Sequence, residues 1–161
     1  MVKPPFTLSV GSTPFGFAFN RRNHLLVSEA GASTSSSYRS ENSVPTRPLV
    51  VTAALATGQP AACWVAVTPN DRQVYTGNAG GSSLSLFEIN RLGAATLLAS
   101  VAGATGGGAG NIAIAAHGRS LSVQAPRTPA IVSFAIGEDG ALSATGTVAG
   151  LPVGVVGLAA N

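Results

Sequence analysis

The side chain best suited to chemistry in this sequence is the carboxyl group of Glu29. It is one of only six acidic residues and closely follows the short apolar run Leu25–Val27. A carboxylate at the end of a strand can act as a general base or orient a water molecule if its pKa is tuned and the reacting proton lies within hydrogen-bond reach. The alternative is a loop glutamate that is solvated or paired with an arginine. Glu29 is therefore the candidate catalytic residue, with both interpretations open.

The histidines and the single cysteine favour structural roles. His24 and His117 each fall in a polar turn close to an arginine, and a turn at the rim of a repeat predicts surface histidines. With no third ligand nearby, the sequence predicts no metal site at either histidine. Cys63 is the only cysteine, so it forms neither an intrachain disulfide nor a cysteine-based metal site. Its apolar surroundings indicate a small buried side chain. We predict no metal and no cofactor.

Two segments of biased composition suggest ligand binding at first sight. Residues 103–110 are rich in glycine, but they lack the Gly-Lys-Ser/Thr ending of a phosphate-binding loop and no helical pattern follows them. We predict a flexible linker between repeats there. Ser33–Ser37 is predicted to be a polar loop, because no nucleophile elbow surrounds its serines.

Charge and hydropathy exclude several classes of partner. The net charge is +3, and the arginines are scattered without interleaved aromatic residues, so we expect no nucleic-acid partner. No continuous apolar stretch is long enough to span a membrane. Residues 1–5 lack the apolar core of a signal peptide, so the chain as written carries no export address and is expected in the cytoplasm.

The composition and patterning predict an all-β protein. Hydrophobic residues make up 45% of the 161 residues and charged residues only 9%, which argues against disorder. Short apolar or alternating runs recur along the chain and no long stretch keeps helical spacing. The 20 glycines and 10 prolines mark frequent turns between these runs.

An internal repeat organises the predicted strands. A short apolar strand, a polar turn and a second apolar strand occur three times, and Phe19, Val67 and Ile114 follow one another at intervals of 48 and 47 positions. A propeller blade is four antiparallel strands in about 40–50 residues, so the period fits. We predict a partial β-propeller with blades at 14–59, 60–108 and 109–150 and a terminal strand at 151–161.

Residues that recur at the same place in the repeat are predicted to pack between blades. There are three such columns: Phe17, Val65 and Ile112; Phe19, Val67 and Ile114; and Leu26, Val74 and Leu121.

Three blades and a fraction are too few for ordinary closure. Closed propellers have about four to eight blades. The chain is therefore expected to be a fragment, one part of a homo-oligomer that completes a ring, or a structure with exposed apolar surface.

Several stretches together resemble bacterial seven-bladed lactonase-family proteins, relatives of 6-phosphogluconolactonase and of the fungal carboxymuconate cyclase. The resemblance covers nearly all of this chain but less than half of a full family member, and it implies the C-terminal portion of such a propeller. The stretches that carry it are Pro14–Phe19, Leu26–Ala30, Ser33–Tyr38, Cys63–Pro69, Tyr75–Gly80 and Gly157–Ala160.

The resemblance implies hydrolysis of a sugar lactone or related cyclic ester, with water attacking the lactone carbonyl and export allowed. Family members are associated with His, Glu and Arg residues in a central cleft, and only Glu29 can be matched to these here. Asn111 stands where an aspartate is expected at the head of a blade. The alternative function is a non-catalytic propeller fragment that serves as a binding or structural module, or an incomplete gene product.

Overall fold

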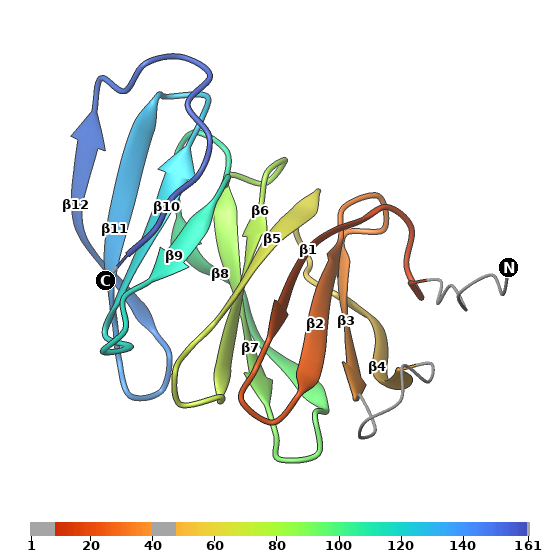
Figure 1. The fold of residues 1–161 in the computed structure, drawn as a ribbon. Coiled ribbons are helices and arrows are strands. Elements are labelled where there is room, and N and C mark those ends of the chain that lie inside the picture. Colours follow the sequence, from red (N-terminus) through yellow and green to blue (C-terminus); the bar gives the residue numbers. More distant parts are fainter. Residues whose placement is uncertain (1–8, 40–47, 161) are drawn as a thin grey trace, which may run out of the picture.

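The computed structural model describes residues 9–39 and 48–160, and every regular element in these ranges is a β-strand. The strands form three four-stranded antiparallel sheets in chain order (Figure 1). The all-β, propeller-like architecture predicted from the repeat is confirmed. Blade 1 contains β1 (Pro14–Phe19), β2 (His24–Glu29), β3 (Thr34–Arg39) and β4 (Leu49–Ala56); blade 2 contains β5 (Ala62–Val67), β6 (Gln73–Asn78), β7 (Ser83–Ile89) and β8 (Ala95–Ala104); blade 3 contains β9 (Ile112–Ile114), β10 (Ser120–Ala125), β11 (Ala130–Ile136) and β12 (Leu142–Ala149).

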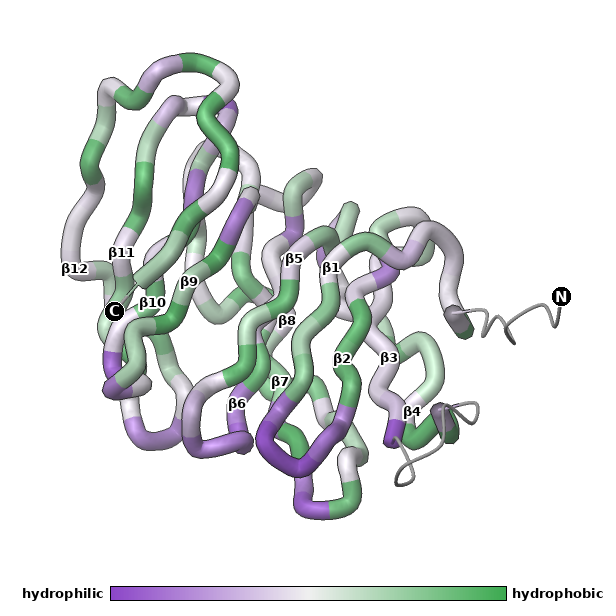
Figure 2. The backbone as a smooth tube through the Cα atoms, in the orientation of Figure 1, coloured by the Kyte–Doolittle hydropathy of each residue, from purple (hydrophilic) through white to green (hydrophobic). Residues whose placement is uncertain are grey.

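The turn between the first two strands has the same construction in every blade. Each turn contains a residue with positive φ near its end: Asn23 at 60°, Asp71 at 62° and Gly118 at 71°. Asparagine, aspartate and glycine are the residues that tolerate this left-handed conformation best. These polar turns gather at one end of the three sheets, where they appear purple in Figure 2.

The turn of blade 1 is one residue shorter than the other two, and this corrects one predicted column. Phe19 pairs with Leu25, Val67 with Val74, and Ile114 with Leu121. The column is therefore Leu25, Val74 and Leu121, and the assignment of Leu26 to it is wrong. Since successive strand residues point to opposite faces, Leu26 points the other way and packs against Val74 and Phe87 of blade 2.

The blades stack face to back. We call the face of each blade that carries the corrected columns its front face, and the opposite face its back face. The front face of blade 2 packs on the back face of blade 1, and the front face of blade 3 packs on the back face of blade 2 through Leu121, Val123 and Phe134. Tyr75 adds a polar contact between the last two blades, because its hydroxyl donates to the Gly140 carbonyl oxygen at 2.6 Å.

The connection from one blade to the next is fastened to the blade that it leaves. Ser33 and Ser82 precede the third strands of blades 1 and 2, and both have positive φ. The hydroxyl of Ser33 accepts from Ala61 N at 3.0 Å, and that of Ser82 accepts from Gly108 N at 2.9 Å. Both acceptors hold residues of the following linker, so the two linkers are held in the same way.

Three local predictions are corrected by the structure. Ser33–Ser37 is not a loop from Thr34 onward, because Thr34–Arg39 is strand β3 and its serines are buried. A serine-rich strand can be buried where its hydroxyls find partners; Ser37 donates to the Gly93 carbonyl oxygen at 2.6 Å. His24 is buried rather than on the surface, with its ring next to the Asn20 amide.

His117 lies exposed in its turn, as predicted. The predicted terminal strand is the third correction: residues 151–160 pair with no strand, although Leu151 N donates to the Pro129 carbonyl oxygen at 3.0 Å. The described part of the chain contains no helix that could cross a membrane.

Candidate functional site

Glu29 ends β2 and lies entirely inside the protein, with none of its surface exposed. Its Oε1 accepts hydrogen bonds from Ser9 Oγ at 2.7 Å, Gly11 N at 2.8 Å and Ser36 Oγ at 2.8 Å. Its Oε2 accepts from Thr34 Oγ1 at 2.5 Å. The carboxylate thus ties the segment that enters blade 1 to the third strand of that blade.

The pKa of Glu29 is set by two opposing effects. Burial raises it, but the hydrogen bonds from Thr34, Ser9, Gly11 and Ser36 together outweigh burial and hold the pKa below its usual value of 4.5. The group is therefore ionised at neutral pH. Both oxygens already accept hydrogen bonds and neither is exposed, so in this arrangement the carboxylate organises the surrounding chain.

The segment next to Glu29 fits only a small residue. A Cβ on Gly11 would lie 2.5 Å from the Glu29 carboxyl carbon, well inside any normal contact. The backbone N–H of Gly11 reaches the carboxylate because this position has no side chain.

Blade 2 repeats this arrangement with different chemistry. Asn78 occupies the position of Glu29 at the end of the second strand, and its Nδ2 donates to Ser83 Oγ at 3.2 Å and Ser85 Oγ at 2.8 Å. These serines occupy the positions of Thr34 and Ser36. The recurrence indicates that a buried polar group at this position braces the second strand against the third.

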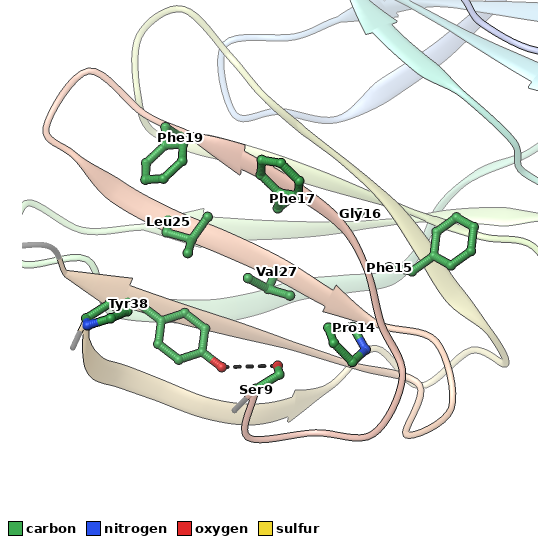
Figure 3. A pocket seen from close by; sticks show the side chains of 10 residues that line it. Ser9, Pro14, Phe15, Gly16, Phe17, Phe19, Leu25, Val27 and Tyr38 are labelled. Atoms are coloured by element: carbon green, nitrogen blue, oxygen red, sulfur yellow. Dashed lines mark hydrogen bonds between the residues drawn. The ribbon is translucent and has the colours of Figure 1, made fainter. Parts of the chain in front are cut away.

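An apolar hollow of about 500 Å³ lies on the front face of blade 1 (Figure 3). Phe17 is 68% exposed there and Phe19 is also exposed. The Tyr38 ring is buried on the other side of Leu25 from Phe19. Its hydroxyl accepts from Val10 N at 3.0 Å and lies 3.2 Å from Ser9 Oγ. The hollow is lined by Ser9, Pro14, Phe15, Gly16, Phe17, Phe19, Leu25, Val27, Tyr38 and Pro48.

The exposure of Phe17 and Phe19 corrects the prediction that both pack between blades. Their column partners in blades 2 and 3 do pack between blades, but the described residues place no blade in front of blade 1. The signal in the sequence for this exposure was that both phenylalanines belong to the first copy of the repeat, which has no preceding copy in this sequence to cover it. The hollow suits an apolar surface far better than the hydroxyl groups of a sugar.

A second, polar groove of about 700 Å³ lies among the turns at the opposite ends of the strands from Glu29. It brings His117 and Arg119 close to Arg21 and Glu138. The structure therefore groups neither histidine with Glu29, whose partners are three hydroxyls and one backbone N–H. Within residues 9–39 and 48–160 no group of three or more metal-ligating side chains comes together.

The sequence matches no known family model and no curated protein. Solved structures match it in fold. A functionally unknown protein from Desulfotomaculum acetoxidans has a TM-score of 0.77 at 18% identity, covering 88% of this chain and 44% of that one. A "putative 6-phosphogluconolactonase" from Bacteroides fragilis has a TM-score of 0.75 at 16% identity, covering 89% and 41%. The periplasmic gluconolactonase of Pseudomonas aeruginosa has a TM-score of 0.67 at 13% identity, covering 88% and 44%.

This chain spans less than half the length of each of these neighbours. At such low identity the likeness shows the fold alone, which is lactonase-like.

Proposed function

We propose that this chain is a structural and binding module with a lactonase-like fold, corresponding to the C-terminal portion of a lactonase-family propeller. Its open front face on blade 1 accepts the apolar face of a further β-sheet. The observation that supports this proposal is that residues at equivalent positions differ in solvent exposure among the three blades. Phe17 is 68% exposed, whereas the front faces of blades 2 and 3 are covered by the preceding blade.

The energetics favour covering this face. Burying one large apolar side chain contributes about 1.5–3 kcal/mol, and Phe17 and Phe19 stand together on β1. The edge of the hollow is fixed in place, because the Phe15 ring meets Trp64 of blade 2 edge to face at 5.3 Å. This contact supports one edge of the face that the partner would cover.

A fluorescent probe of apolar surface tests this proposal in dilute protein solution. We expect 1-anilinonaphthalene-8-sulfonate to brighten with the wild-type chain and to lose most of that gain in Phe17→Asp, which puts a charge in the hollow. Leu92→Asp is the matched control, because Leu92 is equally exposed and lies in a turn away from the hollow. Equal probe binding by the wild type and Phe17→Asp would contradict the proposal.

Hydrolysis of a lactone is the second candidate, favoured by the neighbours named as gluconolactonases and by the carboxylate of Glu29. In that reaction Glu29 would take a proton from water as the water oxygen attacks the lactone carbonyl and the ring C–O bond opens. The contacts of Glu29 count against it, since Ser9 and Gly11 must first move away for water to reach the carboxylate.

Incubation with 6-phosphogluconolactone and other lactones separates the two functions. We expect the wild-type chain to give no rate above spontaneous hydrolysis, because Glu29 is buried and fully engaged. The comparison includes Glu29→Gln and, as a control, Glu88→Gln at an exposed glutamate. A rate in the wild type that Glu29→Gln removes and Glu88→Gln keeps would establish the hydrolase instead.

A further inference from the structure

We propose that the front face of blade 1 is filled by residues 151–160 of a second copy of this chain, so that two copies close head to tail into one ring. This inference rests on the proposed function in one respect, namely that the hollow accepts an apolar partner. It adds the identity of the partner and the geometry of the contact.

Residues 151–160, which we call the C-terminal segment, have the chemistry of such a partner. The segment reads Leu-Pro-Val-Gly-Val-Val-Gly-Leu-Ala-Ala and carries no charged side chain. It belongs to no strand, and Val153 and Val156 are 91% and 83% exposed. An uncharged, valine-rich segment outside any strand resembles the hollow, because both expose apolar surface to solvent.

The C-terminal segment lies over the back face of blade 3. The Gln124 side chain donates a hydrogen bond to the Val155 carbonyl oxygen. Gln124 points to the back face, because its strand neighbours Val123 and Ala125 belong to the core between blades 2 and 3. The segment is therefore attached to the face of blade 3 that turns away from blade 2.

The C-terminal segment cannot fill the hollow of its own chain in this arrangement. Blade 2 packs on the back face of blade 1 and stands between it and blade 3, so the open front face and the C-terminal segment lie at the two ends of the stack (Figure 1). Contact between them must join two molecules. Because the two surfaces differ, the contact is heterologous, and such contacts form a ring when the rotation closes.

Closure with two copies agrees with blade number and with chain length. Two copies supply twice three blades, which falls within the range of about four to eight for closed propellers. The alignment with the Desulfotomaculum protein uses 88% of this chain but 44% of that one. That neighbour is thus about as long as two copies of this chain. Burial of the contact also strands no charge, since the residues that line the hollow and the C-terminal segment are all uncharged.

Sedimentation equilibrium on the full chain tests this inference with one variant at each end. We expect a dimer for the wild type and for the control Leu92→Asp. Phe17→Asp and Val153→Asp should each be monomeric, with a dissociation constant raised by about a hundredfold or more, because an unpaired carboxylate would be buried. An equimolar mixture of these two variants should form a heterodimer, since one intact hollow then meets one intact C-terminal segment.

Other outcomes overturn the inference. A monomeric wild type at every concentration would exclude self-association, although probe binding in the hollow would still support the proposed function. A dimer that survives Val153→Asp but not Phe17→Asp would mean that two front faces meet. A dimer that survives both variants would use another surface, and species that grow steadily with concentration would exclude a closed ring. A cooperative thermal unfolding transition and a wild-type circular dichroism spectrum would verify that each variant is folded, since loss of the dimer by itself lowers the midpoint.

Discussion

Replacing Glu29 with alanine is expected to lower the free energy of unfolding by about 3 kcal/mol, measured by urea denaturation. The change leaves the Gly11 N–H and the Ser9, Thr34 and Ser36 hydroxyls without their acceptor. Each hydrogen bond to a charged group contributes about 1.5–3 kcal/mol, and a buried donor left unsatisfied is costly, while relaxation toward solvent recovers part of the loss. Glu29→Gln keeps the shape and one acceptor oxygen, so its loss should be smaller.

The free energy of unfolding of Glu29→Gln should depend on pH differently from that of the wild type. The folded protein holds the pKa of Glu29 below its usual value of 4.5, so the unfolded chain takes up the proton more readily. The stability from this group is therefore present above about pH 4.5 and is lost as the pH falls through the lower pKa of the folded state. Glu29→Gln should lack this part of the acid loss, whereas Glu88→Gln should retain it. Parallel stability curves for the wild type and Glu29→Gln would refute this role for the carboxylate.

Gly16→Ala is expected to destabilise the protein by about 3 kcal/mol, because it forces blades 1 and 2 apart. A Cβ on Gly16 would lie 2.9 Å from Trp64 Cα and even closer to the Cys63 carbonyl oxygen, and both are backbone atoms that no rotamer change can move. The same contact is fixed by Ser28, whose hydroxyl donates to the Cys63 carbonyl oxygen at 2.6 Å and accepts from Gly16 N at 3.0 Å.

Gly146→Ala is the matched control for this prediction. Gly146 also lies in a strand, but a Cβ there would meet no atom within 4 Å. Its urea midpoint should stay near that of the wild type, while the midpoint of Gly16→Ala falls. Equal midpoints for the two variants would show that the approach of β1 to β5 tolerates a side chain.

The repeat made the blades predictable from the sequence. The burial of polar segments could not be predicted in this way. A period of 47–48 residues with alternating apolar positions specifies the strands locally. The burial of Ser35 and Ser37 depends instead on partners far along the chain, since Ser35 lies 3.3 Å from Thr76 Oγ1 and Ser37 reaches Gly93. His24 escaped prediction for the same reason, because Gly93 of blade 2 covers its ring.

The position of Glu29 at the end of a strand was predictable, but its surroundings were not. Ser9 and Gly11, which occupy Oε1, precede it by 20 and 18 residues, and no spacing rule brings them there. The columns likewise predict that a face is apolar without saying whether anything covers it. Phe17 and Val65 therefore occupy the same column of the repeat, but Phe17 is exposed and Val65 packs against blade 1.

The hydroxyls of Ser33 and Ser82, which hold the linkers at Ala61 and Gly108, belong to the repeat and set how the chain leaves blades 1 and 2. A duplicated unit would carry its own joint and would set its successor at the same angle. The number of blades could then change through gain or loss of whole units, without new solutions at each junction, because the energetics of such arrays depend mainly on nearest neighbours. In this respect the fold behaves as a modular chain whose length evolution can adjust one unit at a time.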